Sequence, residues 1–282
     1  MANRYFENEN HTKLYQKYRM TAPKALVQRV INYLKEKYSG ELELAVDIGC
    51  GSGQNTYIVA DYFKKVIGID VSPNQIANAV KANERTNVEF QLGAAEKLNL
   101  PDGSVQLITA MAAVHWLDLP KFFEEGLRVL SPGGVMAVYS YFISFYEWPR
   151  DPTKNEAIKK FYEEIILEGE LGQFWSEPIR KHIFTKYKNI SIPYDDFTRD
   201  DTFRNERHMS LTGMLGEMQT FSGFQSLREA KGDEAAGDLL DRLKNGILEI
   251  IKDDLSPEES NLDEIYFEEK SPLFLLLARK PV

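Results

Sequence analysis

One short segment constrains the fold of this chain more than any other. Residues 45–54 read AVDIGCGSGQ, an apolar strand that runs into a loop with three glycines. A second apolar stretch at residues 66–72, VIGIDVS, then places Asp70 at the end of the next strand. Glycines let a backbone approach a ligand closely, and an acidic residue about twenty positions further on is placed to bind a ribose. The pattern predicts a parallel α/β sheet that holds a nucleoside-type cofactor at its carboxyl edge.

Two features favour S-adenosylmethionine over a dinucleotide as that cofactor. The dinucleotide fingerprint G-x-G-x-x-G/A needs a small third residue, so that the helix packs closely on the strand. That position falls on Gln54 when the pattern starts at Gly49, and on Thr56 when it starts at Gly51. Asp47 stands in the strand just before the loop. A carboxylate there suits a cationic ammonium group or a bridging water, and it would repel a pyrophosphate.

Later segments occur in the order that one enzyme family shows. The D-x-G-x-G-x-G loop resembles motif I of the class I methyltransferases, and the resemblance extends over residues 42–140. Residues 93–98, GAAEKL, are similar to the adenine-side motif of that family. Residues 115–116, HW, end the fourth predicted strand, and residues 125–134 read EGLRVLSPGG. The family commonly has an aspartate where this chain has Ala94, so we expect one hydrogen bond to the adenine to be missing.

The resemblance implies a Rossmann-like, doubly wound α/β fold. Its sheet is expected to have seven mostly parallel strands with an antiparallel last strand, and a helical, aromatic-rich substrate cap. The expected divisions are a helical lid at 1–41, the cofactor-binding core at 42–140, the cap insertion at 141–232, and a C-terminal helix and final strands at 233–282. Acidic residues dominate from 253 to 269 and are expected to form a solvated loop and edge strand. The residues expected to bind the cofactor are Tyr18, Arg19, Asp47, Gly49, Gly51, Gly53, Asp70, Val71, Ala95, Glu96 and Met111.

The predictions of a lid and of a substrate cap depend on aromatic residues. In related enzymes an aromatic and basic N-terminal segment folds over the cofactor; alternatively, its tyrosines pack the first helix onto the sheet. Residues 217–224, EMQTFSGF, and the Y-x-x-Y-R pattern at 15–19 resemble the trans-aconitate methyltransferase-like (methyltransferase type 11) subgroup. Aromatic side chains suit a pocket for a partly apolar small molecule, although they could equally form the core of the cap. The residues expected to bind the substrate are His115, Trp116, Tyr141, Trp148, Trp175, Thr220, Phe221 and Ser222.

The acceptor chemistry is left open by the sequence. The first expectation is O-methylation of a small carboxylate by direct in-line transfer, which needs no base because the acid is ionised at neutral pH. An amine or phenol acceptor would need a proton acceptor, and His115 is the candidate. We expect His115 first as a pocket wall, so that His115→Ala loosens the pocket. A cofactor-binding protein without catalysis is a further alternative. The cations that could clamp a carboxylate are Arg19, Arg180, Arg204, Arg207 and His208.

The composition of the chain limits the classes of partner that it is expected to bind. A net charge of -9 argues against a nucleic-acid substrate, because phosphate binding needs clustered Lys and Arg. The polar N-terminal residues and the lack of a long apolar run predict a cytoplasmic enzyme without a membrane partner. Cys50 is the only cysteine and is expected to fill space in the loop. No metal site is expected, and the oligomeric state is left unknown.

Overall fold

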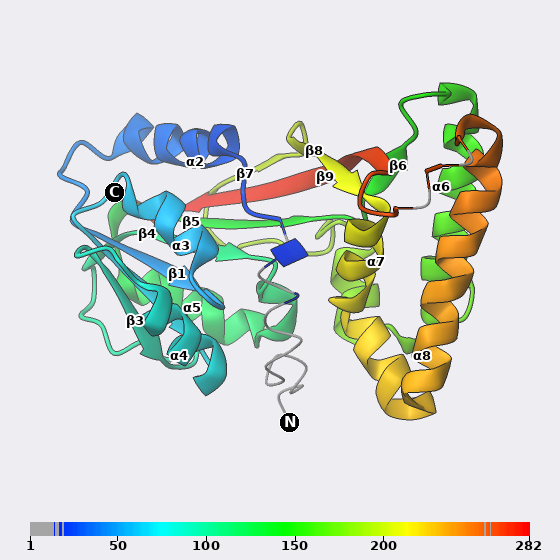
Figure 1. Ribbon diagram of the computed structural model, residues 1–282. Helices are drawn as coiled ribbons and strands as arrows, with labels where there is room; N and C mark the ends of the chain where they lie inside the picture. The colour runs from blue at the N-terminus through cyan, green and yellow to red at the C-terminus, as the bar shows by residue number, and fades with distance from the viewer. Residues whose placement is uncertain (1–13, 15–16, 19, 257, 260) are drawn as a thin grey trace.

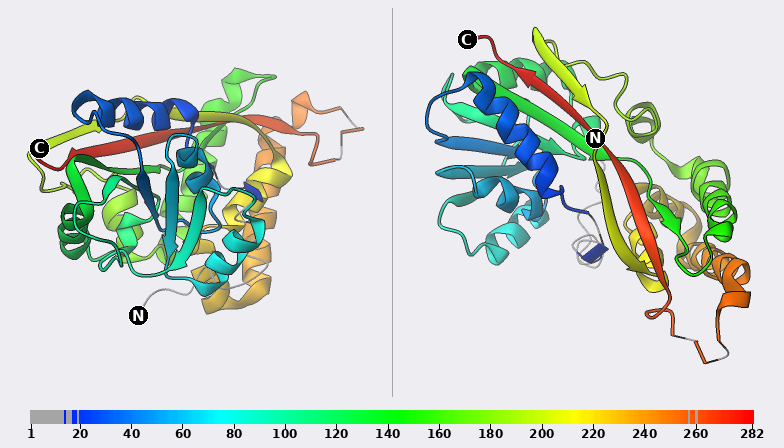
Figure 2. Two further views of the ribbon diagram at one scale, coloured as in Figure 1. Left: turned by 90° about the vertical axis from the view of Figure 1, so that its left-hand side faces the viewer. Right: turned by 90° about the horizontal axis from the view of Figure 1, so that it is seen from above.

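The computed structural model describes residues 14, 17–18, 20–256, 258–259 and 261–282. These residues form an α/β core and a largely helical cap, and one long strand, β9 (Tyr266–Arg279), runs through both (Figures 1 and 2). No helix among them combines the length and the apolar composition that crossing a bilayer requires.

The core sheet follows the order β3-β2-β1-β4-β5-β9-β7, which makes seven strands within the described residues. Neighbours from β3 to β5 are parallel, whereas β9 is antiparallel to both β5 and β7. The predicted doubly wound sheet with an antiparallel last strand is therefore confirmed. The other strands of this sheet are β1 (Leu44–Ile48), β2 (Lys65–Asp70), β3 (Val88–Leu92), β4 (Val105–Met111), β5 (Leu130–Tyr141) and β7 (Asp196–Asp200).

Helices cover both faces of the sheet. Successive strand residues point to opposite faces of the sheet. Ala45 therefore packs in one hydrophobic cluster with Leu26, whereas Val46 packs in a second cluster with Phe122. Both faces are buried, which explains why these strands are apolar throughout rather than alternating. Helices α2, α3 and α4 contribute residues to the first cluster, and α5 contributes residues to the second. The helices are α2 (Lys24–Lys37), α3 (Gln54–Ala60), α4 (Pro73–Ala82) and α5 (Leu119–Val129).

The cap is built on the first half of β9. Residues 266–272 pair with β6 and β8, and residues 273–279 pair with β5 and β7 in the core sheet. Three helices complete the cap beside these strands (Figure 1). The cap elements are β6 (Phe145–Glu147), α6 (Asn155–Glu163), β8 (Arg204–Ser210), α7 (Leu211–Gln219) and α8 (Ser222–Ile251).

Two expectations about the second half of the chain are corrected. The cap insertion was expected to span 141–232, but β7 lies within that range and belongs to the core sheet. Its sequence, DFTRD, is a polar edge strand with a single apolar residue, so it carries no alternating signal. Glu269 falls in the stretch expected to be solvated, yet it is only 1% exposed. Its burial is possible because the Arg207 guanidinium donates to it at 2.6 Å.

Candidate active site

A cavity of about 440 Å³ lies at the carboxyl ends of β1, β2 and β4. β2 and β3 lie on one side of β1, and β4 and β5 lie on the other. Ligands of open α/β sheets bind at this point, where the strand order reverses. We call it the cofactor cavity. Of the residues expected to bind a cofactor, it is lined by Gly49, Gly51, Asp70, Val71, Ala95, Glu96 and Met111.

The glycine loop turns where side chains would collide. Gly49 has φ +63°, and a Cβ built on it would lie 2.4 Å from the Cβ of Ala113 at the end of β4. Gly53 has φ +91° and begins α3, and a Cβ there would lie 2.4 Å from the ring of Phe90. Gly53 is not part of the cavity lining. Gly53 allows the turn and the packing of α3, and its contact with the cofactor stays a prediction.

Asp70 is the best-positioned acidic group of the cofactor cavity. Its Oδ2 accepts a hydrogen bond from the Gly51 N–H at 2.9 Å, and its Oδ1 accepts one from the Ser72 N–H at 2.8 Å. Burial raises the pKa of the Asp70 carboxyl, and these N–H groups oppose the shift. A carboxylate has about four acceptor positions, so Asp70 retains capacity for ligand hydroxyls after these two bonds.

Asp47 supports the site from below instead of lining it. The side chain is 2% exposed and lies outside the cavity lining. Its carboxylate accepts hydrogen bonds from the hydroxyls of Thr56 at 2.6 Å and Thr109 at 2.7 Å. Burial raises the pKa of Asp47 to about 6, against the effect of the two hydroxyls. Asp47 therefore ties the start of α3 to β4 beneath the glycine loop, and its part in cofactor binding stays a prediction.

Gln75 is a cavity residue that the sequence analysis missed. It is 4% exposed and lines the cofactor cavity, and its Oε1 has no hydrogen-bond partner in the described structure. Ser72 and Gln75 have the S-x-x-Q spacing of a capping box, in which the Gln side chain bonds back to the Ser N–H. Here the Ser72 N–H donates to Asp70, so the Gln75 side chain is not needed there. The capping-box spacing was the available signal, and its incomplete form leaves an acceptor in the cavity.

Gln75→Met is expected to weaken binding of the cofactor about fivefold, since one hydrogen bond contributes about 1 kcal/mol. The variant keeps the side-chain length and removes an unsatisfied buried acceptor, so the ligand-free protein should be at least as stable. Calorimetric titration and thermal unfolding measure the two effects. The exposed Gln28→Met is the control and should change neither. Equal losses of stability and affinity would contradict the assignment.

The N-terminal segment contacts the cap. The Tyr18 ring packs on Gly216 of α7, where an added Cβ would lie 2.3 Å from it, and the Tyr18 carbonyl accepts from Arg207 at 2.7 Å. Tyr18 does not line the cofactor cavity. In this structure its ring contacts α7, and its contact with the cofactor stays a prediction. Arg19 lies outside the described residues.

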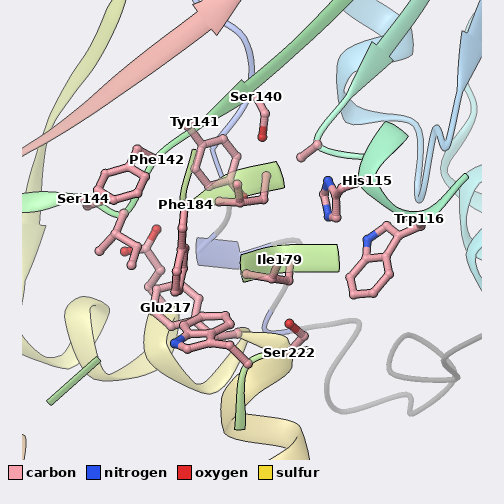
Figure 3. A pocket seen from close by; sticks show the side chains of 15 residues that line it. His115, Trp116, Ser140, Tyr141, Phe142, Ser144, Ile179, Phe184, Glu217 and Ser222 are labelled. Atoms are coloured by element: carbon pink, nitrogen blue, oxygen red, sulfur yellow. The ribbon is translucent and has the colours of Figure 1, made fainter. Parts of the chain in front are cut away.

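A second cavity, of about 80 Å³, adjoins the first between the core and the cap (Figure 3). We call it the acceptor cavity. Ala112 and Trp116 line both cavities, so the two meet at the end of β4. Ala112 has φ +50°, an uncommon conformation for a residue with a side chain, and such strain concentrates at functional sites. Of the residues expected to bind substrate, the acceptor cavity is lined by His115, Trp116, Tyr141, Trp175, Phe221 and Ser222.

Trp148 and Thr220 do not line the acceptor cavity. The Trp148 indole packs against Phe267, with ring centroids 5.1 Å apart, and donates to Asp254 at 2.8 Å. The Thr220 hydroxyl donates to the Glu217 carbonyl at the end of α7. Trp148 thus belongs to the core of the cap and Thr220 lies at the end of α7, and their contact with a substrate stays a prediction.

His115 is held at the junction by a tyrosine that the sequence analysis did not identify. The His115 Nδ1 lies 2.7 Å from the hydroxyl of Tyr187, which is fully buried. Burial raises the pKa of Tyr187, so its hydroxyl stays protonated at neutral pH. Tyr187 has φ +56°, and its position 72 residues from His115 left no local signal for the pairing. The contact fixes the orientation of the imidazole in the wall of the acceptor cavity.

Comparison with known proteins agrees with this arrangement. The methyltransferase domain family matches residues 46–138. One similar protein comes from Dictyostelium discoideum, and its name describes a methyltransferase. The two sequences are 35% identical over 269 residues, which are 95% of this chain and 93% of that protein. A second similar protein comes from Saccharomyces cerevisiae, and its name describes an S-adenosylmethionine-dependent methyltransferase. The two sequences are 29% identical over 184 residues, which are 64% of this chain and 59% of that protein.

A solved structure described as a methyltransferase from Anaeromyxobacter dehalogenans shares the fold. It covers 94% of this chain and 99% of its own, with a TM-score of 0.70 and 24% identity. The Dictyostelium relative matches nearly the whole chain, well beyond the cofactor-binding half. The protein therefore belongs to the class I S-adenosylmethionine-dependent methyltransferases, and S-adenosylmethionine is its cofactor.

Proposed function

We propose that this enzyme methylates a small molecule bound in the acceptor cavity. The observation that carries the proposal is that this cavity meets the cofactor cavity at Ala112 and Trp116. The lining of the acceptor cavity is mainly aromatic and aliphatic with a few polar groups, which is typical of small-molecule sites. The net charge of -9 disfavours RNA or DNA as the acceptor. A cytoplasmic setting is part of the same proposal.

The described residues favour a hydroxyl or amine acceptor over the carboxylate expected first. None of the described residues that line the acceptor cavity is a lysine or an arginine. The Arg180 guanidinium donates to the carbonyls of Trp175 and Gly172, and Arg207 donates to Glu269. A carboxylate moved out of water needs a cation or several hydrogen-bond donors, and these arginines are already engaged.

The residues of this chain then have separate tasks. Asp70 and the buried Gln75 Oε1 are hydrogen-bond acceptors at the cofactor cavity, so they fit a ligand whose hydroxyl and amino groups donate. S-adenosylmethionine supplies an activated methyl group, which leaves the protein to align the acceptor, exclude water and take its proton. When the Tyr187 oxygen accepts the His115 Nδ1–H, the lone pair of His115 lies on Nε2. We assign the proton acceptor to that nitrogen.

His115→Ala is expected to lower kcat about a hundredfold or more with a smaller change in acceptor affinity, because general base catalysis contributes about 10²- to 10⁴-fold. Tyr187→Phe keeps the ring and removes the hydroxyl, so it should lower kcat and alter its pH profile while leaving acceptor affinity near wild type. Steady-state kinetics over pH 6–9 separate these effects. If His115→Ala raises only KM, the side chain is a pocket wall, as first expected.

The proposed function is tested by methyl transfer from labelled S-adenosylmethionine. Purified protein is incubated with panels of small phenols, amines and carboxylic acids, and with bulk protein and RNA. Label transferred to a small phenol or amine supports the proposal. Transfer to protein or RNA alone would overturn it, and cofactor binding without transfer to any acceptor would favour a binding protein.

A further inference from the structure

Phe184 lines two cavities at once. It belongs to the wall of the acceptor cavity, where Figure 3 shows its ring beside Phe142, with the two ring centroids 6.4 Å apart. It also lines a third cavity, of about 450 Å³, which we call the outer cavity. The other described residues that line the outer cavity are Thr185, Lys186, Lys188 and Asn189. All of these except Lys186 are exposed, so the outer cavity opens to solvent.

The acceptor cavity is small in comparison. Its volume is about 80 Å³, whereas pockets for drug-sized ligands have about 300–1,000 Å³. It therefore admits only a small group next to the cofactor cavity. Among the described residues, Phe184 is the one wall residue that the acceptor cavity and the outer cavity share. A smaller side chain at this position would join the two cavities.

The backbone around Phe184 is held in place on both sides. Phe184 directly follows the π-helical segment η5 (Ile179–Ile183), a conformation that is frequent at functional sites, and its N–H donates to the Ile179 carbonyl at 3.1 Å. Three residues further on, the fully buried Tyr187 has its hydroxyl 2.7 Å from the His115 Nδ1. Because both sides are fixed, loss of the Phe184 ring would leave space that the backbone does not fill.

The outer cavity is positively charged among the residues that the structure describes. Lys186 and Lys188 line it, and none of its described lining residues is an Asp or a Glu. The Lys186 ammonium lies 4.9 Å from the ring centroid of Phe142, a wall residue of the acceptor cavity. Residues 178–194 contain four Lys and Arg and no acidic residue, although the whole chain has a net charge of -9. A negatively charged group at this place would be attracted.

We propose that Phe184 determines which acceptors the enzyme takes, by closing the acceptor cavity toward the outer cavity. The inference rests on the proposed function, because it concerns the molecule that the acceptor cavity takes. Phe184 excludes acceptors whose substituent would have to pass its ring. A smaller residue at position 184 admits such substituents, and the added space favours those that carry a negative charge.

The test uses two matched series, 4-alkylphenols and 4-alkylanilines, with alkyl chains of zero, two, four and six carbons. Binding to protein saturated with S-adenosylhomocysteine is measured calorimetrically at pH 7.5, and methyl transfer from labelled S-adenosylmethionine gives kcat/KM. In the wild type, the butyl member of the better series should lose about tenfold or more against the unsubstituted member, because a closed pocket discriminates by this much for one methylene. Phe184→Ala should reverse that order.

The charge of the chain end distinguishes an opening into the outer cavity from loosened packing. Butyl chains that end in a carboxylate or an ammonium group are compared in Phe184→Ala. The carboxylate should bind about fivefold more tightly, the upper range for a partly exposed ion pair. Adding Lys186→Gln should reduce this preference. Equal gains for the neutral, anionic and cationic chains would indicate general loosening and overturn the inference.

Phe184→Leu and a matched control complete the set of variants. Phe184→Leu removes less of the side chain and should give an intermediate size limit, so the inference stays testable if the alanine variant does not fold. Phe161→Ala truncates a half-buried phenylalanine of α6 that packs on Gly246 and lines neither cavity. It should leave the size limit unchanged. An unchanged size limit in both Phe184 variants would overturn the inference.

The failure of this inference is distinguishable from failure of the proposed function. Wild-type protein that takes the hexyl members as well as the unsubstituted ones, with methyl transfer to a small molecule intact, overturns the inference alone. So does the absence of binding of every member to the wild type and to Phe184→Ala, if another small molecule is methylated. Methyl transfer confined to protein or RNA overturns the proposed function.

Discussion

Asp70→Ala is expected to weaken the binding of S-adenosylmethionine about a hundredfold or more while the fold remains intact. The carboxylate is aligned by the Gly51 and Ser72 N–H groups at the edge of the cofactor cavity. Hydrogen bonds from ligand hydroxyls to a charged group contribute about 1.5–3 kcal/mol each, and two of the weakest correspond to about a hundredfold. Calorimetric titration with S-adenosylmethionine and S-adenosylhomocysteine measures the loss.

Asp70→Asn separates affinity from stability. Because burial raises the pKa of Asp70, the folded state holds its proton more tightly than the unfolded chain does. The raised pKa means that stability falls as pH rises above the unfolded pKa of about 3.9, so the ionised carboxylate is a cost at neutral pH. The Asn variant removes this charge but places an NH₂ group opposite one of the two N–H donors. These effects oppose each other, so the unfolding temperature without ligand should stay near that of wild type, while the cofactor binds about tenfold more weakly.

Asp61→Asn is the matched control, because Asp61 is an exposed aspartate paired with Arg85. It should alter neither the unfolding temperature nor the affinity by more than a small amount. Unchanged cofactor binding in Asp70→Ala would contradict the placement of the cofactor beside β2.

The cofactor half could be predicted from sequence because its geometry is local. A strand end, a glycine loop and the next strand end place Gly49, Gly51 and Asp70 together within a short segment. Sequence alone did not give the surroundings of every residue of this motif. The Asp47 side chain bonds to Thr56 and Thr109 beneath the loop, and the backbone of Gly53 lies close to the Phe90 ring.

The acceptor half could not be predicted in this way, because its contacts join distant segments. Glu217 meets Tyr146 across 71 residues, and His115 meets Tyr187 across 72. A buried glutamate is rare unless it is paired, and the partners are known only once β8 and β9 align. Composition also does not distinguish a wall residue such as Trp175 from a core residue such as Trp148.

Arg279→Met is expected to lower the free energy of unfolding by about 3 kcal/mol, the lower end of the cost of breaking a buried ion pair. Arg279 is 2% exposed near the end of β9, and its Nε donates to Asp196 of β7 at 2.9 Å. Its Nη groups donate to the carbonyls of Leu34 at the end of α2 and of Gly133 before the paired part of β5. One side chain thus joins four elements, and methionine would fill the space without these bonds. Urea unfolding at pH 7 measures the loss.

The pH dependence of the stability loss in Arg279→Met tests whether the ion pair with Asp196 causes it. Hydrogen bonds from Lys37, Tyr33 and Arg279 lower the pKa of Asp196 to about 2, against the effect of burial. A lowered pKa adds stability above the unfolded value of about 3.9, and this stability disappears as pH falls through 2. The difference between wild type and Arg279→Met should therefore shrink from pH 5 to pH 2. Lys37→Met removes an exposed partner of the same carboxylate and should cost less than about 1 kcal/mol. An equal cost for both variants at pH 7 would mean that burial of Arg279 is not what stabilises this junction.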